Sequence, residues 1–206
     1  GAAIGPDGAC YVCNNGGFEW HDMGGIVVPG NQPKDYIGGR IQRVDIATGE
    51  VTDLYTSCDG HPLRAPNDLV MDGHGGFYFT DHGIRDEHAR TTDLTGIYYA
   101  RCDGSSITEV VFPVQSPNGI GLSPDGTKLY WAETMSGRVF QRDIAGPGEL
   151  VARELLDLSG VLCGLPGFQL FDSLAVDGAG NICVATLVNG GILRQPTILW
   201  QPPGTE

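Results

Sequence analysis

Four segments of the chain share one pattern, and the distance at which they recur constrains the fold more than any other feature. Each has a small or polar start, a short apolar run, an Asp-Gly turn and a second apolar run. The segments are residues 1–15 (GAAIGPDGACYVCNN), 65–81 (APNDLVMDGHGGFYFTD), 116–133 (SPNGIGLSPDGTKLYWAE) and 171–186 (FDSLAVDGAGNICVAT). No long stretch holds a 3.6-residue apolar period. Recurrence at this spacing indicates stacked or radially arranged units.

The Asp-Gly turns identify these units as β-hairpins. A tight turn between two apolar runs needs positive φ, which glycine tolerates. Further hairpins with polar turns are predicted in residues 39–55, 96–112 and 137–156. Each period then supplies about four strands, which is one blade of a β-propeller. Together with 32 glycines and 13 prolines, this predicts an all-β fold.

The spacing also bears on how much of a propeller is present. At about 50 residues per blade, the 206 residues make about four blades. The first repeat begins just after its equivalent of Asn118, and residues 193–206 are proline-rich and depart from the pattern. We therefore expect one propeller domain over residues 1–206 that is part of a larger ring, with an atypical tail at 193–206. A complete four-bladed ring is the alternative.

The net charge of −13 argues against nucleic acid or an anionic membrane as a partner, because both select basic surfaces. No apolar stretch approaches the ~20 residues of a membrane span, and no signal peptide is visible. We expect a cytoplasmic protein that binds a small molecule. The oligomeric state is left open.

Cys10 and Cys13 form a C-x-x-C pair, which raises the possibility of zinc. The pair lies in a predicted strand, where positions three apart face opposite sides. No second pair completes a zinc site, so buried free thiols are the favoured interpretation.

Three polar residues occupy equivalent places at the starts of successive repeats. Asn67, Asn118 and Asp172 are 51 and then 54 residues apart (67 to 118, 118 to 172). Since the innermost strand of each propeller blade runs along the central channel, we expect these three to converge at one mouth. Amide and carboxylate oxygens suit Ca²⁺ or a similar divalent cation. The alternative is that each merely caps a turn, but recurrence at one position of the repeat favours a site.

Other polar residues have weaker support. Asn15 ends a predicted strand, and its side chain either lines the same mouth of the channel or forms a hydrogen bond within a turn. His82 either carries a proton in the reaction or has an imidazole that hydrogen-bonds to nearby backbone groups, and the second interpretation is favoured. Residues 21–25 belong to an irregular segment that reaches about residue 38, which we expect to form a loop over the pocket. No G-x-S-x-G or Cys/His nucleophile pattern is present.

Three of the motifs carry a family resemblance. PNDLVMDGHGGFYFTD, SPNGIGLSPDGTKLYWAE and FDSLAVDGAGNICVATLVNGGI resemble the SMP-30/gluconolactonase/luciferin-regenerating (LRE-like) family of six-bladed propellers, over residues 1 to about 192. The resemblance implies a divalent cation held by a Glu, an Asn and an Asp, with a further Asn near metal and substrate. By motif, Asn118 and Asp172 match the ligands and Asn67 matches the substrate-side Asn.

The chain departs from the family pattern at two positions. The family's Glu has no match, because Glu19 lies in a different motif, GGFEWHD. The Arg that often stands two residues before the Asn of PND is Ala65 here, and Arg64 is one residue away.

The activity that the resemblance implies is metal-assisted opening of a sugar-type lactone. The cation is expected to be Ca²⁺, with Zn²⁺, Mn²⁺ or Mg²⁺ as alternatives. Asp172 would be both a ligand and the candidate catalytic base, and Asn67 and Asn15 would bind substrate. A phosphotriester or aryl-ester hydrolase with the same cation is one alternative. A non-catalytic propeller that binds a protein or sugar on its rim is another.

Overall fold

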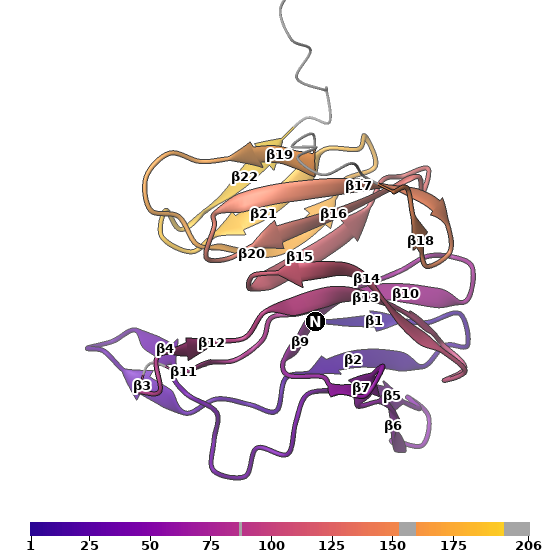
Figure 1. Cartoon of the computed structure of the whole chain (residues 1–206), viewed down its shortest axis with the longest axis horizontal. Helices are drawn as coiled ribbons and strands as arrows, with labels where there is room; N and C mark the ends of the chain where they lie inside the picture. Colours follow the sequence, from indigo (N-terminus) through magenta and orange to yellow (C-terminus); the bar gives the residue numbers. More distant parts are fainter. Residues whose placement is uncertain (87, 153–159, 196–206) are drawn as a thin grey trace, which may run out of the picture.

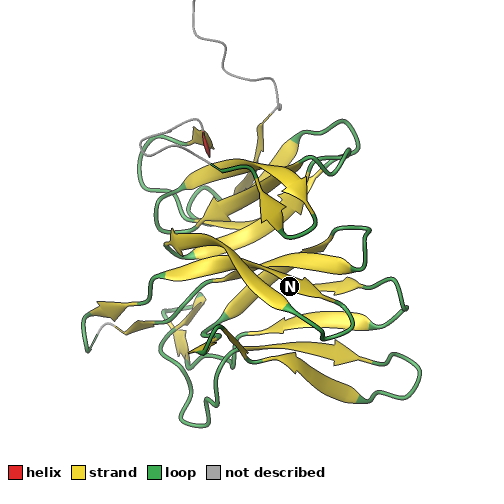
Figure 2. Ribbon diagram, turned by 45° about the vertical axis from the view of Figure 1, so that its right-hand side comes forward, coloured by secondary structure: helices red, strands yellow, loops and turns green. Residues whose placement is uncertain are grey.

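A computed structural model describes residues 1–86, 88–152 and 160–195, and almost all of its regular structure is β-strand. Four antiparallel sheets follow one another along the chain and stack face to face (Figure 1). Figure 2 shows the same succession of sheets turned by 45° about the vertical axis, with loops at both ends of the strands. The predicted all-β, propeller-type architecture is confirmed. The number of blades in the complete ring stays a prediction.

Each sheet is built from strands that are consecutive apart from short inserted hairpins. The first sheet has the order β1 (Ala2–Ile4), β2 (Cys10–Asn14), β5 (Arg40–Val44), β6 (Val51–Tyr55). The second has the order β9 (Pro66–Met71), β10 (Gly76–Asp81), β13 (Thr95–Arg101), β14 (Ile107–Val114). The third contains β15 (Pro117–Leu122), β16 (Lys128–Glu133), β17 (Arg138–Gly146), β18 (Glu149–Leu150) and β19 (Val161–Gly164). The described part of the fourth is β20 (Phe171–Val176), β21 (Ile182–Thr186), β22 (Gly191–Gln195).

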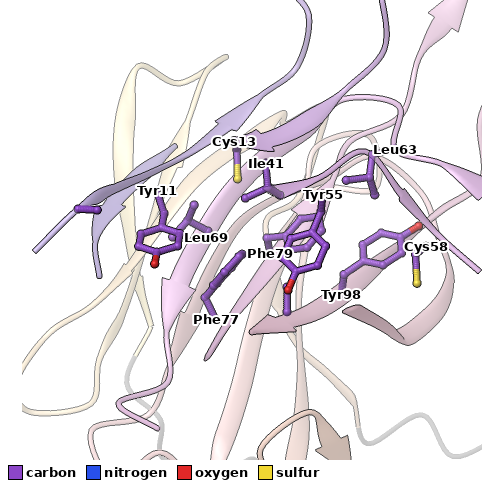
Figure 3. Packing of buried hydrophobic residues seen from close by; sticks show 12 residues of the cluster. Tyr11, Cys13, Ile41, Tyr55, Cys58, Leu63, Leu69, Phe77, Phe79 and Tyr98 are labelled. Atoms are coloured by element: carbon purple, nitrogen blue, oxygen red, sulfur yellow. The ribbon is translucent and has the colours of Figure 1, made fainter. Parts of the chain in front are cut away.

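The central strands are apolar on both faces, and this is how the sheets hold together. Successive side chains of a strand point to opposite faces. In β10, Phe77 and Phe79 pack toward the first sheet, whereas Tyr78 packs toward the third. In β16, Leu129 and Trp131 face the second sheet and Tyr130 faces the fourth. Figure 3 shows the core between the first two sheets, where Tyr11 and Ile41 meet the aromatic rings of the second sheet.

The expectation that the apolar runs of the inner strands are buried between sheets is confirmed in part. Leu69, Ile120 and Leu174 are buried in the three successive cores. Their neighbours Val70, Met71, Leu122 and Val176 are partly buried against the same cores. Ala175 is exposed.

The two ends of the sheets differ. At one end are the predicted tight turns: the carboxylates of Asp72, Asp125 and Asp177 each accept hydrogen bonds from the backbone of their own turn. At the other end lie the starts of the inner strands and the connections from the second strand to the third. These connections are long in the first two sheets (residues 15–39 and 82–94) and short in the next two (residues 134–137 and 187–190).

The long connections contain hairpins of their own. The region expected to be an irregular loop forms β3 (Trp20–Asp22) and β4 (Val27–Pro29), joined through Gly24 and Gly25, both at positive φ. The second connection forms β11 (Arg85–Asp86) and β12 (Thr91–Thr92). A further small hairpin, β7 (Ser57–Cys58) and β8 (His61–Pro62), precedes the second sheet.

All six cysteines are free thiols, but the prediction that they are buried holds only for Cys13 and Cys58, and Cys10 is partly exposed. Burial raises the pKa of the Cys13 thiol. Regular pairing of β22 with β21 extends to Gln195, so the tail boundary expected at residue 193 falls inside this strand. Residues 196–206 lie outside the described part of the chain. Among the residues that the structure describes, no helix is both long and apolar enough to cross a membrane.

The packing predicts a large cost for removing one central ring. Phe77 is fully buried between the first two sheets, so Phe77→Ala should lower the free energy of unfolding by about 3–5 kcal/mol. Phe168, which is 70% exposed, provides a matched control, and Phe168→Ala should change stability by less than about 0.5 kcal/mol. Chemical denaturation of both variants measures the difference. Equal small losses would show that the sheets do not pack through this core.

Candidate functional site

The starts of the inner strands share one departure from regular pairing. Between its paired positions Pro66 and Leu69, β9 advances three residues while β10 advances two, from Asp81 to Phe79. The same irregularity occurs in β15 between Pro117 and Ile120, and in β20 between Phe171 and Leu174. Each is a β-bulge, which bends the strand and changes the direction in which the side chains of the unpaired residues point. The bulged residues are those that the repeat singled out: Asn67–Asp68, Asn118–Gly119 and Asp172–Ser173.

Hydrogen bonds join the starts of β9 and β15. The Thr80 hydroxyl donates to the carbonyl of Asn118 (2.6 Å) and accepts from the backbone N–H of Asp68 (3.2 Å). The Asp68 carboxylate accepts from the backbone N–H groups of Leu69 (3.0 Å) and Ile120 (3.3 Å). These bonds fix the position of Asn118 relative to the preceding sheet.

The starts of β15 and β20 approach each other through Gly119. A Cβ at this position would lie 2.1 Å from the backbone nitrogen of Leu174 and 2.6 Å from the carbonyl carbon of Ser173. Any side chain would therefore push the strands apart. Asn118 and Asp172, which directly precede these residues, are thereby brought to the same edge of the two sheets. The structure thus places β15 between β9 and β20, and the convergence of the Asn67, Asn118 and Asp172 side chains on one cation stays a prediction.

Asn118 carries an oxygen that is available for a ligand. Its side chain is 6% exposed, and its Nδ2 donates to the Thr134 hydroxyl (3.1 Å). Its Oδ1 is buried and has no hydrogen-bond partner among the described residues. A buried acceptor without a partner costs about 1–3 kcal/mol, so such atoms in native sites point to an ion, water or substrate. Because Thr134 holds the amide nitrogen, the oxygen is the atom left for coordination.

Two carboxylates belong to the neighbouring strand starts, Asp68 in the β9 bulge and Asp172 in the β20 bulge. Asp68 is partly buried, and burial raises its pKa, with a further contribution from the negative charge of Asp172. Asp172 is itself partly exposed. A pair of neighbouring carboxylates with an amide oxygen is a suitable donor set for a hard cation, which would offset their mutual repulsion. The residues therefore fit a divalent cation.

His82 lies at the rim of the same region. Burial lowers the pKa of its imidazole, and Asp172 is close enough for its negative charge to oppose that shift. The backbone of Pro117, directly before Asn118, also opposes that shift, and Nδ1 is buried with no hydrogen-bond partner in the described part of the chain. The imidazole is therefore neutral at pH 7. The favoured interpretation, in which local backbone groups satisfy the ring, does not hold for Nδ1.

Asp81 fixes the backbone that carries His82. Its buried carboxylate accepts from the backbone N–H groups of Arg64 (2.7 Å), Ala65 (2.7 Å) and Gly83 (3.0 Å). The N–H of His82 also donates to the carbonyl of Ala65 (2.9 Å). Burial raises the pKa of Asp81, and the three donors act in the opposite direction.

The remaining residues named from the sequence take local partners. The Oδ1 of Asn15 accepts from the backbone N–H of Gly17 (2.9 Å), which is turn chemistry, so its role in substrate binding stays a prediction. Asn67 is partly buried in the β9 bulge. The Arg64 guanidinium pairs with Asp93 at 2.8 Å. Within the described ranges, no three His, Cys, Asp or Glu side chains group closely enough to hold a metal, so any cation here depends on amide oxygens.

Comparison with known proteins identifies the family. A family model described as the SMP-30/gluconolactonase/LRE-like region matches residues 1–197. The chain belongs to this family.

Relatives and solved structures agree with that assignment. A protein named lactonase drp35 from Staphylococcus saprophyticus is 31% identical over 194 residues, covering 92% of this chain and 51% of the relative. The chain thus spans about half the length of the curated relatives that it matches. A gluconolactonase structure from Xanthomonas campestris superimposes with a TM-score of 0.62 at 22% identity, covering 95% of this chain and 60% of that one. Regucalcin from Agrobacterium tumefaciens, described as a calcium-binding protein, gives 0.65 at 20% identity, covering 94% and 55%. At these identities the structures show the shared fold.

The Thr134 contact generates a prediction about cation affinity. Thr134→Val removes the acceptor that holds Asn118 Nδ2, so the amide can rotate and Ca²⁺ affinity should fall by about 10-fold or more. Thr134→Ser keeps a hydroxyl and should retain affinity close to that of the unmodified protein. Calorimetric Ca²⁺ titration, with thermal unfolding as a check on folding, measures both. Equal affinities for the Val and Ser variants would exclude this role.

Proposed function

We propose that the protein is a lactonase that uses one divalent cation to open a sugar-type lactone with water. The observation that carries the proposal is the buried, unpartnered Oδ1 of Asn118 beside the start of the strand that bears Asp172. Membership of a family whose relatives are named lactonase and gluconolactonase supports the reaction class.

Ca²⁺ is the cation that the donor set favours. The candidate ligands are oxygen atoms only, and hard oxygen donors select Ca²⁺ or Mg²⁺ over the softer transition metals. Regucalcin, a neighbour in fold, is described as calcium-binding, which supports the same choice. Zn²⁺, Mn²⁺ and Mg²⁺ are the alternatives that a metal titration would separate.

Asn118, Asp172 and Asn67 have different roles in the proposed reaction. Asn118 and Asp172 would hold the cation, and Asn67 would orient the lactone at the start of β9. When bound, the cation supplies Lewis-acid polarisation of a carbonyl. Asp172 is the candidate base: its carboxylate accepts a proton from the attacking water. The hydroxide adds to the carbonyl carbon, the acyl C–O bond of the ring breaks, and the proton taken up by Asp172 returns to the ring oxygen, which leaves as a hydroxyl. The product is a hydroxy acid.

Two alternatives share parts of this site. A phosphotriester or aryl-ester hydrolase would use the same cation and the same carboxylate on a different substrate. A non-catalytic binding propeller would have no need for an unpartnered amide oxygen at the mouth. Assays of a phosphotriester and an aryl ester beside the lactone would separate the first alternative, and the cation dependence of the lactone rate separates the second.

The test is the rate of lactone opening against Ca²⁺ concentration in three variants. Asp172→Asn removes the one charged residue of the motif-matched set and should lower the rate by about 10²-fold or more while weakening cation binding. Asn118→Ala should act through affinity, so excess Ca²⁺ should restore part of its activity. Asn67→Ala should keep the cation and lower turnover.

A matched control separates charge loss in general from loss at the site. Asp59 is exposed, and its backbone has a positive φ that Asn also adopts, so Asp59→Asn removes one carboxylate without strain. This variant should behave as the unmodified protein does. Full, cation-independent activity of Asp172→Asn would refute the proposed centre and leave the binding propeller as the better interpretation.

A further inference from the structure

The residue that follows the second strand occupies the same place in three successive sheets. Its backbone N–H donates to the carbonyl of the residue directly before the inner strand of that sheet. The three bonds are His82 to Ala65 (2.9 Å), Thr134 to Ser116 (3.0 Å) and Leu187 to Leu170 (2.9 Å). Because these bonds are equivalent, each of the three residues approaches the bulge of its own inner strand in the same way.

The strand register assigns each of these residues one partner in the bulge. The paired residues at the starts of the inner strands are Pro66 with Asp81, Pro117 with Glu133, and Phe171 with Thr186. The next residue on either strand gives the pairs Asn67 and His82, Asn118 and Thr134, and Asp172 and Leu187. In the second pair the side chains are hydrogen-bonded, since Asn118 Nδ2 donates to the Thr134 hydroxyl at 3.1 Å.

The side chains of the three pairs are chemically matched. Where the bulge residue is an asparagine, its partner has a side chain that accepts hydrogen bonds, a hydroxyl in Thr134 and an imidazole in His82. Where the bulge residue is Asp172, whose ionised carboxylate has no proton to donate, the partner is the aliphatic Leu187. The contact in the third sheet therefore indicates what the pair in the second sheet does.

The ring of His82 has an acceptor without a partner. Its Nδ1 is buried and has no hydrogen-bond partner in the described ranges. Burial lowers the pKa of the ring, and the backbone of Pro117 opposes this shift. Since proline has no N–H, its backbone favours a proton on the ring nitrogen that faces it. That nitrogen is Nε2, because Nδ1 has no partner, so the neutral ring carries its lone pair on Nδ1.

His82 also lines a pocket of about 480 Å³ that adjoins the candidate site. The β3–β4 hairpin and the residues around it form another wall, and Figure 1 shows this hairpin to one side of the stacked sheets. Polar side chains on that wall are those of His21, Asn31 and Gln32. Because Pro117 and Asp172 both act on the pKa of His82, this residue lies between the pocket and the candidate cation site.

We propose that His82 is a positioning residue that orients Asn67, with Nδ1 of His82 accepting a hydrogen bond from Nδ2 of Asn67. The Asn67 amide makes no hydrogen bond to another described residue, so it is free to turn into this position. Its Oδ1 is then left as an acceptor, as Thr134 leaves that of Asn118. The group that Asn67 binds on the substrate is therefore a hydroxyl. The inference rests on the proposed function for its reaction, and adds how Asn67 is oriented and which group it recognises.

The first test is a double-mutant cycle on the rate of lactone opening. His82→Leu gives this position the residue type that the fourth sheet has there, and it should lower kcat/KM for gluconolactone by about 10-fold. In an Asn67→Ala background the same change should lower kcat/KM by less than about 2-fold, because the side chain that His82 orients is already absent. An equal loss in both backgrounds, or no loss in either, would overturn the proposal.

Two further variants separate the acceptor from the ring. His82→Thr introduces the hydroxyl that holds Asn118 in the third sheet, so it should keep kcat/KM within about 3-fold of the unmodified protein. His61 is exposed on β8, so His61→Leu removes an imidazole elsewhere and should leave kcat/KM unchanged. If His82→Thr loses as much activity as His82→Leu, the acceptor role is wrong.

The second test is independent of turnover. In the presence of Ca²⁺, the ¹⁵N NMR signal of His82 Nδ1 should be that of an unprotonated ring nitrogen, and it should move when Asn67→Ala removes the donor. A protonated Nδ1, or a signal that does not respond to Asn67→Ala, refutes the pair. If the signals show the pair but no lactone is opened, the pair stands and the proposed reaction fails.

Discussion

The β-bulge at the start of each inner strand determines the geometry of the end of the sheets where the candidate cation site lies. In a regular strand, Asn118 and Gly119 would point to opposite faces, and one of the two side chains would enter the core between sheets. The bulge removes both residues from the regular pairing with β16, so neither side chain has to enter the core. Gly119 then lies against the backbone of β20, and the Asn118 amide is held by Thr134 with its oxygen unpartnered. The same device in β9 turns the Asp68 carboxylate toward the backbone of β15.

Two chemically different regions meet at this mouth. The strand starts contribute oxygen acceptors, namely the amide of Asn118 and the carboxylates of Asp68 and Asp172. The adjoining pocket contributes imidazole and amide groups from His21, His82, Asn31 and Gln32. A cation suits the first region, whereas the imidazole and amide groups of the second both donate and accept hydrogen bonds.

The repeat made most of the fold predictable, because each copy supplies its own turn and its own apolar runs. The predicted hairpins formed, and Leu69, Ile120 and Leu174 are buried as expected. The β3–β4 hairpin was not predicted, although Gly24–Gly25 between WHD and VVP is a turn signal of the same kind. Its strands are too short and too exposed to show an apolar period.

The site was less predictable for a geometric reason. The repeat located Asn67, Asn118 and Asp172, and the structure places the starts of their strands side by side. The contact between Asn118 and Thr134 was missed because it crosses from β15 to the turn after β16, next to a bulge. At a bulge, the alternation of side chains between the two faces of a strand no longer predicts which way a residue points. The link from Asp68 to Ile120 was missed because it joins different sheets.

The central strands carry a further consequence for folding. Since β10 and β16 are apolar on both faces, a one-residue slip would exchange one set of buried side chains for another, and alternation alone would not oppose it. The polar bulges would oppose it, because a slip would bring Asn118 or Asp68 into an apolar core without its partners. The residues proposed to bind the cation thus also mark the alignment of the strands. Selection for catalysis and selection for correct strand pairing would act on the same few side chains.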